Sequence, residues 1–306
     1  MSRDSKSIYL RQNERGMIDA QKVASHCYSL GKRLTIFLAL ILILFPVGVN
    51  IFVLFIDNAT VNAILSVLSF VLLVIAEIIR WQIKKAKFNG AEMQQYFDEY
   101  VFSLNNTCKK YLPPSKRLTL TERSKLYNKY KDKSAGPYRN WYADYSALPY
   151  EQAVYQCQKE NIRWDLSIRK KYRIFLMIVV ALLGLLIIIN AILQRMEISS
   201  LILVISSIFP LFSYFISSFK KLSADITAWE KLYSHIEKIE NEIKCEKEIC
   251  DEIEELQVEI FSYRQKAYLI PNWFYKMHRK KLQDFEDSYA KMICEYKKLN
   301  DEEKKQ

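Results

Sequence analysis

The chain is poor in the residues that build most catalytic and metal sites. Its 306 residues include only three histidines, six cysteines and six glycines. It has no glycine-rich phosphate loop, no G-x-S-x-G nucleophile motif and no H-E-x-x-H zinc motif. The cysteine spacing matches no zinc pattern either. We therefore expect no catalytic residue, no metal and no cofactor, and a membrane enzyme ranks third among the classes of function.

Four long segments almost entirely lack charge. They are 34–56, 59–79 (interrupted only by Glu77), 174–193 and 198–219. A helix of about 20 apolar residues crosses the roughly 30 Å of hydrocarbon in a bilayer. The first segment follows 33 largely polar residues and is too long for the apolar part of a signal peptide. The sequence therefore predicts an integral protein of the lipid bilayer with four transmembrane helices.

Lysine and arginine cluster at one end of each apolar segment. Only short connections join the first pair of segments and the second pair, whereas basic residues stand at all the opposite ends. Basic residues favour the cytosolic side of a membrane. We expect both termini and the central segment to be cytosolic, so a signal has to arrive from inside the cell.

No stretch alternates with the period of a strand, so the predicted fold class is all-α. A helical break is expected at Pro113 and Pro114, a turn at Gly136, and a helix running from Pro149 into the third span. Past residue 222, apolar residues at coiled-coil spacing predict one helix to about Leu269 and a second after Pro271. The predicted division of the chain is an N-terminal amphipathic helix (1–33), hairpin 1 (34–79), a cytosolic central segment (80–173), hairpin 2 (174–219) and a coiled-coil helical hairpin (220–306).

The central segment carries a basic excess equal to the net charge of +11 of the whole chain. Anionic lipid explains part of it, because each juxtamembrane Lys or Arg contributes about 1 kcal/mol at a charged leaflet. However, nine basic residues lie at 109–133, away from both membrane junctions, against Glu122 and Asp132 only. This excess favours a polyanionic partner.

Polar residues are aligned within two of the apolar segments. Helix packing through small residues explains such stripes in many membrane proteins. The alternative is that they line a path for water or ions once subunits assemble. The candidate pore-lining residues are Asn62, Ser66, Ser69, Glu77, Ser199, Ser206, Ser213 and Ser217.

A polar helix face directly precedes the third span. Asn161 and Trp164 share this face, flanked by Gln158, Asp165 and Arg169. The tryptophan is either a buried anchor or part of a ligand wall. In the second case an aromatic ring stacks a base, amides read its edge and arginine meets phosphate. The sequence alone leaves both alternatives open.

Several motifs together resemble one bacterial family. They are R-Q-N-E at 11–14, the approach to the first span at 28–33, N-W-Y at 140–142, L-P at 148–149 and C-Q-x-x-N-x-x-W-D at 157–165. The family is the SMODS-associating four-transmembrane effectors, and the order of hairpin, central segment, hairpin and helical tail is similar too.

The resemblance implies a pore-forming effector of antiphage defence in the bacterial inner membrane. It implies a cyclic oligonucleotide made by a partner nucleotide cyclase as the trigger, and a homo-oligomer as the active form. The candidate ligand-binding residues are Arg11, Gln12, Asn13, Arg139, Trp141, Tyr142, Gln158, Asn161, Trp164, Asp165 and Arg169.

Two other classes of function remain open. A small transporter or constitutive channel could have four spans, but it would be expected to carry ionisable residues at the bilayer midplane. Pro46 and Pro210 could kink two of the spans, yet no such residue stands there. A membrane-anchored scaffold with a coiled-coil tail is the other alternative.

Overall fold

The computed structural model describes residues 4–55, 58–104, 117–130, 138–195, 197–242 and 246–303. Within these ranges the chain forms helices and no strand, which confirms the all-α prediction. The helices are α1 (Ser5–Gln12), α2 (Arg15–Phe55), α3 (Ala59–Val101), α5 (Leu120–Tyr130), α6 (Tyr150–Leu193), α7 (Ile198–Glu242), α8 (Glu246–Lys266) and α9 (Asn272–Glu303).

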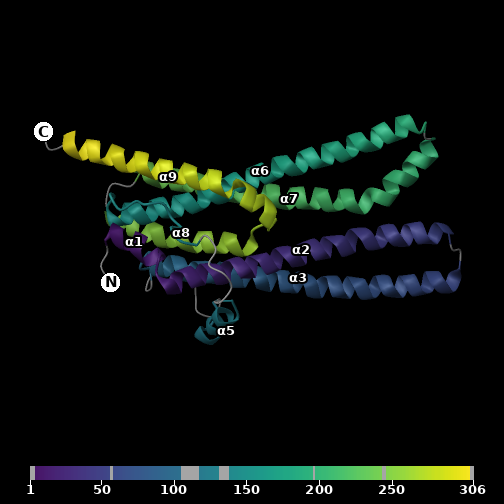
Figure 1. The fold of residues 1–306 in the computed structure, drawn as a ribbon, viewed down its shortest axis with the longest axis horizontal. Helices are drawn as coiled ribbons and strands as arrows, with labels where there is room; N and C mark the ends of the chain where they lie inside the picture. Colours follow the sequence, from purple (N-terminus) through teal and green to yellow (C-terminus); the bar gives the residue numbers. More distant parts are fainter. Residues whose placement is uncertain are drawn as a thin grey trace.

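Two long helical hairpins extend in the same direction (Figure 1). Hairpin 1 is α2–α3 and hairpin 2 is α6–α7, and both turn at the same end of the molecule. Both termini and the helices α1, α5, α8 and most of α9 lie toward the opposite end. Each long helix therefore has a half that belongs to a compact body and a half that projects from it.

The projecting halves are the apolar segments of the sequence. Helices α2, α3 and α6 are each long and apolar enough to cross a membrane, which agrees with the first three predicted spans. The predicted fourth segment, 198–219, forms the first part of α7, where the side chains at 200, 201, 203, 204 and 207 are outside the described part. Helix α7 bends along its length (Figure 1) and contains Pro210, which removes one helical hydrogen bond.

Local sequence signals set several helix starts. The Asn58 side chain caps α3 by accepting from the backbone of Thr60 at 2.9 Å. Thr119 and Glu122 form a reciprocal capping box before α5. Helix α6 starts directly after Pro149, as predicted. The predicted breaks at Pro113 and Gly136 lie outside the described residues.

The C-terminal segment differs from the single long helix predicted through residue 269. Helix α7 ends at Glu242 and α8 begins at Glu246, where the apolar spacing slips by one position. The buried face of α8, which includes Ile253, Leu256 and Ile260, packs against α3 and α6, and α9 packs against α6. The expected coiled-coil seam is thus covered by the long hairpins, because they offer α8 a larger apolar surface than one neighbouring helix does.

One hydrophobic core unites the body. It joins residues from the N-terminal helices, both hairpins and α8 and α9, and it includes the fully buried Phe97, Ile162 and Trp229. The three predicted cytosolic segments are therefore packed together in one body, and the predicted boundaries between the five parts of the chain stay a prediction.

Six of the eight candidate pore residues are exposed on the protomer, whereas Asn62 and Ser69 on α3 are half-buried. Ser199, Ser206, Ser213 and Ser217 are exposed on α7. On α3, Glu77 pairs with Arg80. The hydroxyl groups of three serines donate to the carbonyl four residues earlier on the same helix; these are Ser66, Ser69 and Ser206. Within the described ranges, no side-chain hydrogen bond joins these stripes to another helix of the protomer.

Candidate functional site

A pocket of about 210 Å³ lies where the two hairpins meet in the body. Hairpin 1 contributes side chains of α2 and α3, and hairpin 2 contributes one face of α6. The loop before α6 and the turn between α8 and α9 complete its walls. Every predicted cytosolic segment thus supplies part of this one pocket.

Six of the eleven predicted ligand-binding residues line the pocket. They are Trp141, Tyr142, Asn161, Trp164, Asp165 and Arg169. The four from α6 lie at positions i, i+3, i+4 and i+8, so they share one helix face as the sequence indicated. The structure brings the N-W-Y loop and the C-Q-x-x-N-x-x-W-D helix to one place.

Aromatic rings form much of the pocket wall. The rings of Trp164 and Tyr275 have their centroids 6.2 Å apart. Tyr28 and Trp141 contribute further aromatic surface from α2 and from the loop. Burial raises the pKa of Tyr275 to about 12, so its hydroxyl group stays neutral at physiological pH. Such walls suit a flat, conjugated ligand group.

Buried hydrogen bonds hold the amide wall in place. Asn161 donates to the Tyr142 hydroxyl at 2.7 Å, and this hydroxyl donates to Asp98 on α3. Asp98, which has no exposed surface, also accepts from Arg264 at 2.6 Å and from Gln257 at 3.0 Å. The pocket wall is therefore tied to α3, α6 and α8 at once, and the position of Asn161 depends on all three helices.

Cations from three elements face the pocket. Lys32 is half-buried, donates to Asn272 at 2.8 Å, and has its ammonium group 5.5 Å from the centroid of the Tyr275 ring. Burial lowers the pKa of Lys32 to about 8. Arg169 and Arg279 line the same pocket. Because a buried ammonium group loses hydration, an anion beside Lys32 would stabilise its charged form.

Acidic groups in the wall are partly neutralised. Burial raises the pKa of Glu160 to about 8, although its carboxylate accepts from the backbone of Ala143 at 3.1 Å. Asp165 lies 3.7 Å from the Arg169 guanidinium. Near neutral pH the wall thus carries more positive than negative charge, which favours an anionic ligand.

The turn between α8 and α9 is bonded to hairpin 2. Arg169 on α6 donates to the carbonyl of Tyr268 at 3.0 Å and pairs with Asp225 on α7 at 2.5 Å. The backbone of Tyr268 donates to the same Asp225 carboxylate at 3.0 Å. One side of the pocket therefore rests on both helices of hairpin 2.

The same turn is bonded to hairpin 1. Lys87 on α3 donates to the carbonyl of Lys266 at 2.7 Å. Asn272 donates to Ser29 on α2 at 3.0 Å. Gly31 permits close approach, because a Cβ there would lie 3.0 Å from a methyl carbon of Leu269. The turn thus bridges the two hairpins, and the pocket lies directly against it.

The R-Q-N-E residues form a structural clamp outside the pocket. Gln12 accepts from the backbone N–H of Tyr142 at 2.7 Å and donates to its carbonyl at 3.1 Å. Asn13 exchanges two hydrogen bonds of 3.0 Å with Asn140. Arg11 donates to Ser103 at 2.6 Å. These three candidates position the N-W-Y loop and do not reach the pocket.

Gln158 and Arg139 also lie outside the pocket wall. Gln158 is buried and donates to the Ile253 carbonyl at 2.8 Å and to Gln257 at 3.1 Å, so it joins α6 to α8. Arg139 is exposed in the loop. Gln158 is outside the pocket wall because its amide is used in the contact between α6 and α8, and Arg139 belongs to the loop before α6.

Two of the four basic residues in the described part of the basic stretch form ion pairs. Arg117 pairs with Glu92 at 3.1 Å and with Glu99 at 2.6 Å, and Arg123 pairs with Glu92 at 2.5 Å. Arg123 thereby joins α5 to α3, whereas α5 packs against α2, and no α5 residue lines the pocket. The expected polyanion attraction therefore does not extend to Arg117 and Arg123, and most of the other basic residues lie outside the described part.

Sequence analysis identified six of the 22 residues that line the pocket and missed the other sixteen. The missed residues include Tyr28, Lys32, Arg264, Tyr268, Tyr275 and Arg279. One signal was available, since Gln257 and Arg264 are polar residues seven positions apart on the buried face of α8. Polar residues at regular core positions indicate a buried network.

Comparison with known protein families matches residues 6–292 to the SMODS-associating 4TM effector domain. The match covers nearly the whole chain, including both hairpins and every wall of the pocket. Comparisons with curated proteins and with solved structures found no match.

Proposed function

Because the chain belongs to the SMODS-associating four-transmembrane effector family, we propose that it is a pore-forming effector of bacterial antiphage signalling. A cyclic oligonucleotide made by a SMODS-type cyclase binds the pocket, and the protein then assembles and permeabilises the inner membrane. In this topology both termini and the pocket face the cytosol, where the cyclase releases its product.

The observation that carries the proposal is the chemistry of the pocket at the hairpin junction. It combines aromatic rings such as Trp164 for stacking, the Asn161 amide for a base edge, and Lys32 for phosphate. These are the groups that recognise unpaired nucleotides. A volume of about 210 Å³ is small for a whole cyclic oligonucleotide, so binding has to widen the pocket.

Widening of the pocket couples ligand binding to a movement of the two hairpins. The turn between α8 and α9 is bonded to Lys87 of hairpin 1 and to Arg169 of hairpin 2, so a ligand that displaces it shifts one hairpin relative to the other. A ligand shifts such an equilibrium only by its difference in affinity for the two arrangements. The proposed ligand therefore prefers the wider junction.

Exposed apolar residues on α9 support the assembly of several protomers. Phe285, Met292, Tyr296 and Leu299 are exposed at spacings of seven, four and three residues, which is the pattern of a coiled-coil seam. Copies in one membrane share their orientation, so α9 helices would pair in parallel. Such pairing gathers protomers around a common axis. The polar stripes of α3 and α7 then turn toward that axis.

Dye-filled liposomes containing the purified protein test the proposal. A panel of cyclic oligonucleotides should release dye only when one member binds. Steady release without nucleotide would instead support a constitutive channel or transporter, and no release under any condition would support a scaffold.

The pocket is tested by Lys32→Gln, with Lys220→Gln as a control. Lys220 is exposed on α7 and does not line the pocket. Lys32→Gln should weaken nucleotide binding in calorimetry about tenfold, since a charge-assisted contact is lost. Arg169 is a poorer target because its loss also frees Asp225. Equal affinities of the two variants would place the sensor elsewhere.

A further inference from the structure

A second basic site lies outside the pocket, where α6 enters its apolar half. Ile174, the first residue of the predicted third span, is 52% exposed. Trp273 on the first turn of α9 is 51% exposed and packs edge-on against Phe175, with ring centroids 5.4 Å apart. Helix α9 therefore begins at the level where the lipid-facing surface of α6 begins.

Trp273 has the position of an interfacial anchor. Tryptophan concentrates where hydrocarbon meets headgroups, because its ring is apolar and its N–H group is polar. Met277 follows one turn later on the same face of α9 and is 62% exposed. This exposed surface continues the apolar surface of the third span beyond the end of the span.

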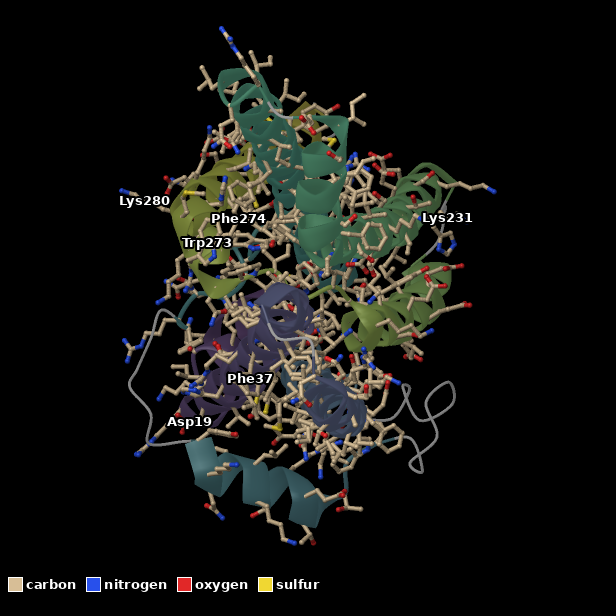
Figure 2. All side chains as sticks on the ribbon, turned by 90° about the vertical axis from the view of Figure 1, so that its right-hand side faces the viewer. Asp19, Phe37, Lys231, Trp273, Phe274 and Lys280 are labelled. Carbon is tan, nitrogen blue, oxygen red and sulfur yellow. The ribbon has the colours of Figure 1, made fainter. Side chains whose placement is uncertain are left out.

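Basic residues surround this surface. Lys280 and Lys281 are exposed on the next turn of α9, and Lys171 lies four residues before Phe175 on α6. Figure 2 shows Lys280 and Trp273 on the same outer side of the molecule. No ion pair joins these three lysines to a carboxylate in the described part of the chain. Asp284, one turn further along α9, ends the basic patch.

Lys171 on α6 and Lys281 on α9 repel each other. Burial and the charge of Lys281 both lower the pKa of Lys171. Two elements of a stable fold rarely bring like charges together without a counter-ion, since the repulsion costs free energy. An anion between Lys171 and Lys281 would remove that cost.

We propose that Lys171, Lys281 and Trp273 form a binding site for an anionic lipid headgroup of the cytosolic leaflet. The phosphate lies between the lysines and the acyl chains follow the exposed surface of α6 from Ile174. Continuity with the lipid-facing span favours a lipid over a free phosphate, because only a lipid occupies both parts. This site fixes α9 to the membrane surface and does not depend on the proposed nucleotide trigger.

Native mass spectrometry of the full chain, extracted from membranes containing phosphatidylglycerol and phosphatidylcholine, tests this site. The test variant is Lys171→Gln with Lys281→Gln. The control is Lys291→Gln with Lys298→Gln, which removes the same charge from exposed positions further along α9. Each juxtamembrane lysine contributes roughly fivefold at an anionic surface, so the test variant should retain phosphatidylglycerol about thirtyfold more weakly. Equal retention by both variants would overturn the site.

Two further measurements separate lipid from phosphate. Brominated phosphatidylglycerol should quench tryptophan emission more than brominated phosphatidylcholine. This difference should decrease in the test variant and in Trp273→Phe, and the part that remains comes from Trp81, which is also exposed. Inorganic phosphate at millimolar concentration should leave the retained lipid unchanged. If phosphate displaces the lipid completely, the site binds a free anion and the lipid assignment is wrong.

Discussion

The two halves of the same long helices satisfy their polar groups in opposite ways. In the body, buried polar side chains bond across elements, as Asp98 of α3 does with Arg264 of α8 and Tyr142 of the loop. In the apolar half, Ser66 and Ser206 bond to carbonyl groups of their own helix. In the part of the chain that the structure describes, the polar contacts that position one hairpin against the other lie in the body.

This difference shows where the arrangement of the hairpins is controlled. Directional bonds in the body specify a single geometry, because a misplaced buried polar group loses its partner. In the apolar half, the free energy of lipid contacts is nearly the same for many arrangements of the hairpins, since hydrocarbon does not distinguish one apolar face from another. A ligand bound in the body therefore changes the arrangement of the hairpins more than contacts within the membrane half do.

The largest effect on the protomer is expected from Asp98→Asn. Asp98 is fully buried and its pairing with Arg264 crosses from α3 to α8. Leaving the arginine without its carboxylate should lower the free energy of unfolding by about 3–5 kcal/mol. The measurement is thermal unfolding of the detergent-solubilised protein, followed by tryptophan emission.

Glu77→Gln is the matched control in the apolar half. Its pairing with Arg80 is between side chains that are 70% and 40% exposed. An exposed ion pair contributes about 1 kcal/mol or less. Similar melting temperatures of Asp98→Asn and Glu77→Gln would show that the buried polar contacts of the body stabilise the protomer no more than the exposed ion pair of the apolar half.

The next effect is a pH dependence of nucleotide binding. Lys32 has a pKa of about 8 in the empty pocket, and a bound phosphate would raise it. Below pH 8 the lysine is already charged and binding is strong; above pH 8 binding has to take up a proton. Affinity should therefore fall roughly tenfold between pH 7 and pH 9 from Lys32 alone. Calorimetry at several pH values measures the slope.

Glu160 acts in the same direction, because it loses its proton near pH 8 and adds negative charge to the wall. Asp165 and Arg169 also face Lys32, with opposite influences on its pKa. Lys32→Gln should reduce the slope, and Lys32→Gln with Glu160→Gln should abolish it. A slope unchanged in both variants would mean that neither group contacts the ligand.

Most of the helices could be predicted from the sequence, because their signals are local. Uncharged segments, the capping box at Thr119 and the proline before α6 depend on neighbouring residues only. The break between α7 and α8 was visible only as a slip in spacing, because a slip can continue a coiled coil as well as end it.

About a quarter of the pocket wall could be predicted and the rest could not, for a physical reason. Trp164 and Asn161 are neighbours on one helix face, so the helical period brings them together. Lys32 and Tyr275 meet them only through packing of elements far apart in the chain. The R-Q-N-E residues became ligand candidates through the family resemblance, whereas in the structure Gln12 uses both amide atoms to hold a loop.

A smaller effect is expected from Gly90→Ala on α3. A Cβ at this position would lie 3.0 Å from the ring of Tyr28, which lines the pocket. The ring has to move by a few tenths of an ångström, while alanine favours the helix by about 0.5–1 kcal/mol. The melting temperature should stay equal to that of the parent protein, while the nucleotide affinity measured by calorimetry falls about threefold.

Gly16→Ala on α2 provides the comparison, because nothing lies within 4 Å of its Cβ position. It should bind nucleotide like the parent protein. If Gly90→Ala also binds like the parent, the Tyr28 ring is not a contact of the ligand and the pocket is wider on that side than the structure indicates.

The smallest effect on the protomer is expected from Ser206→Leu with Ser213→Leu. Both side chains are exposed on α7, and Ser206 bonds only to its own helix, at 2.8 Å to the Ile202 carbonyl. Surface substitutions of this kind change stability by about 0.5 kcal/mol or less. Melting temperature, membrane insertion and nucleotide binding should therefore match the parent protein.

Dye release should nevertheless be lost in this variant. The proposed pore forms only when protomers assemble, and the leucines would then make its surface apolar. Ile205→Leu with Ile216→Leu is the control, since both residues are exposed apolar positions on the same helix. This control should release dye like the parent. Equal dye release by the serine variant and the control would mean that the serine stripe serves helix packing. The apolar half would then have no polar function in the assembled protein either.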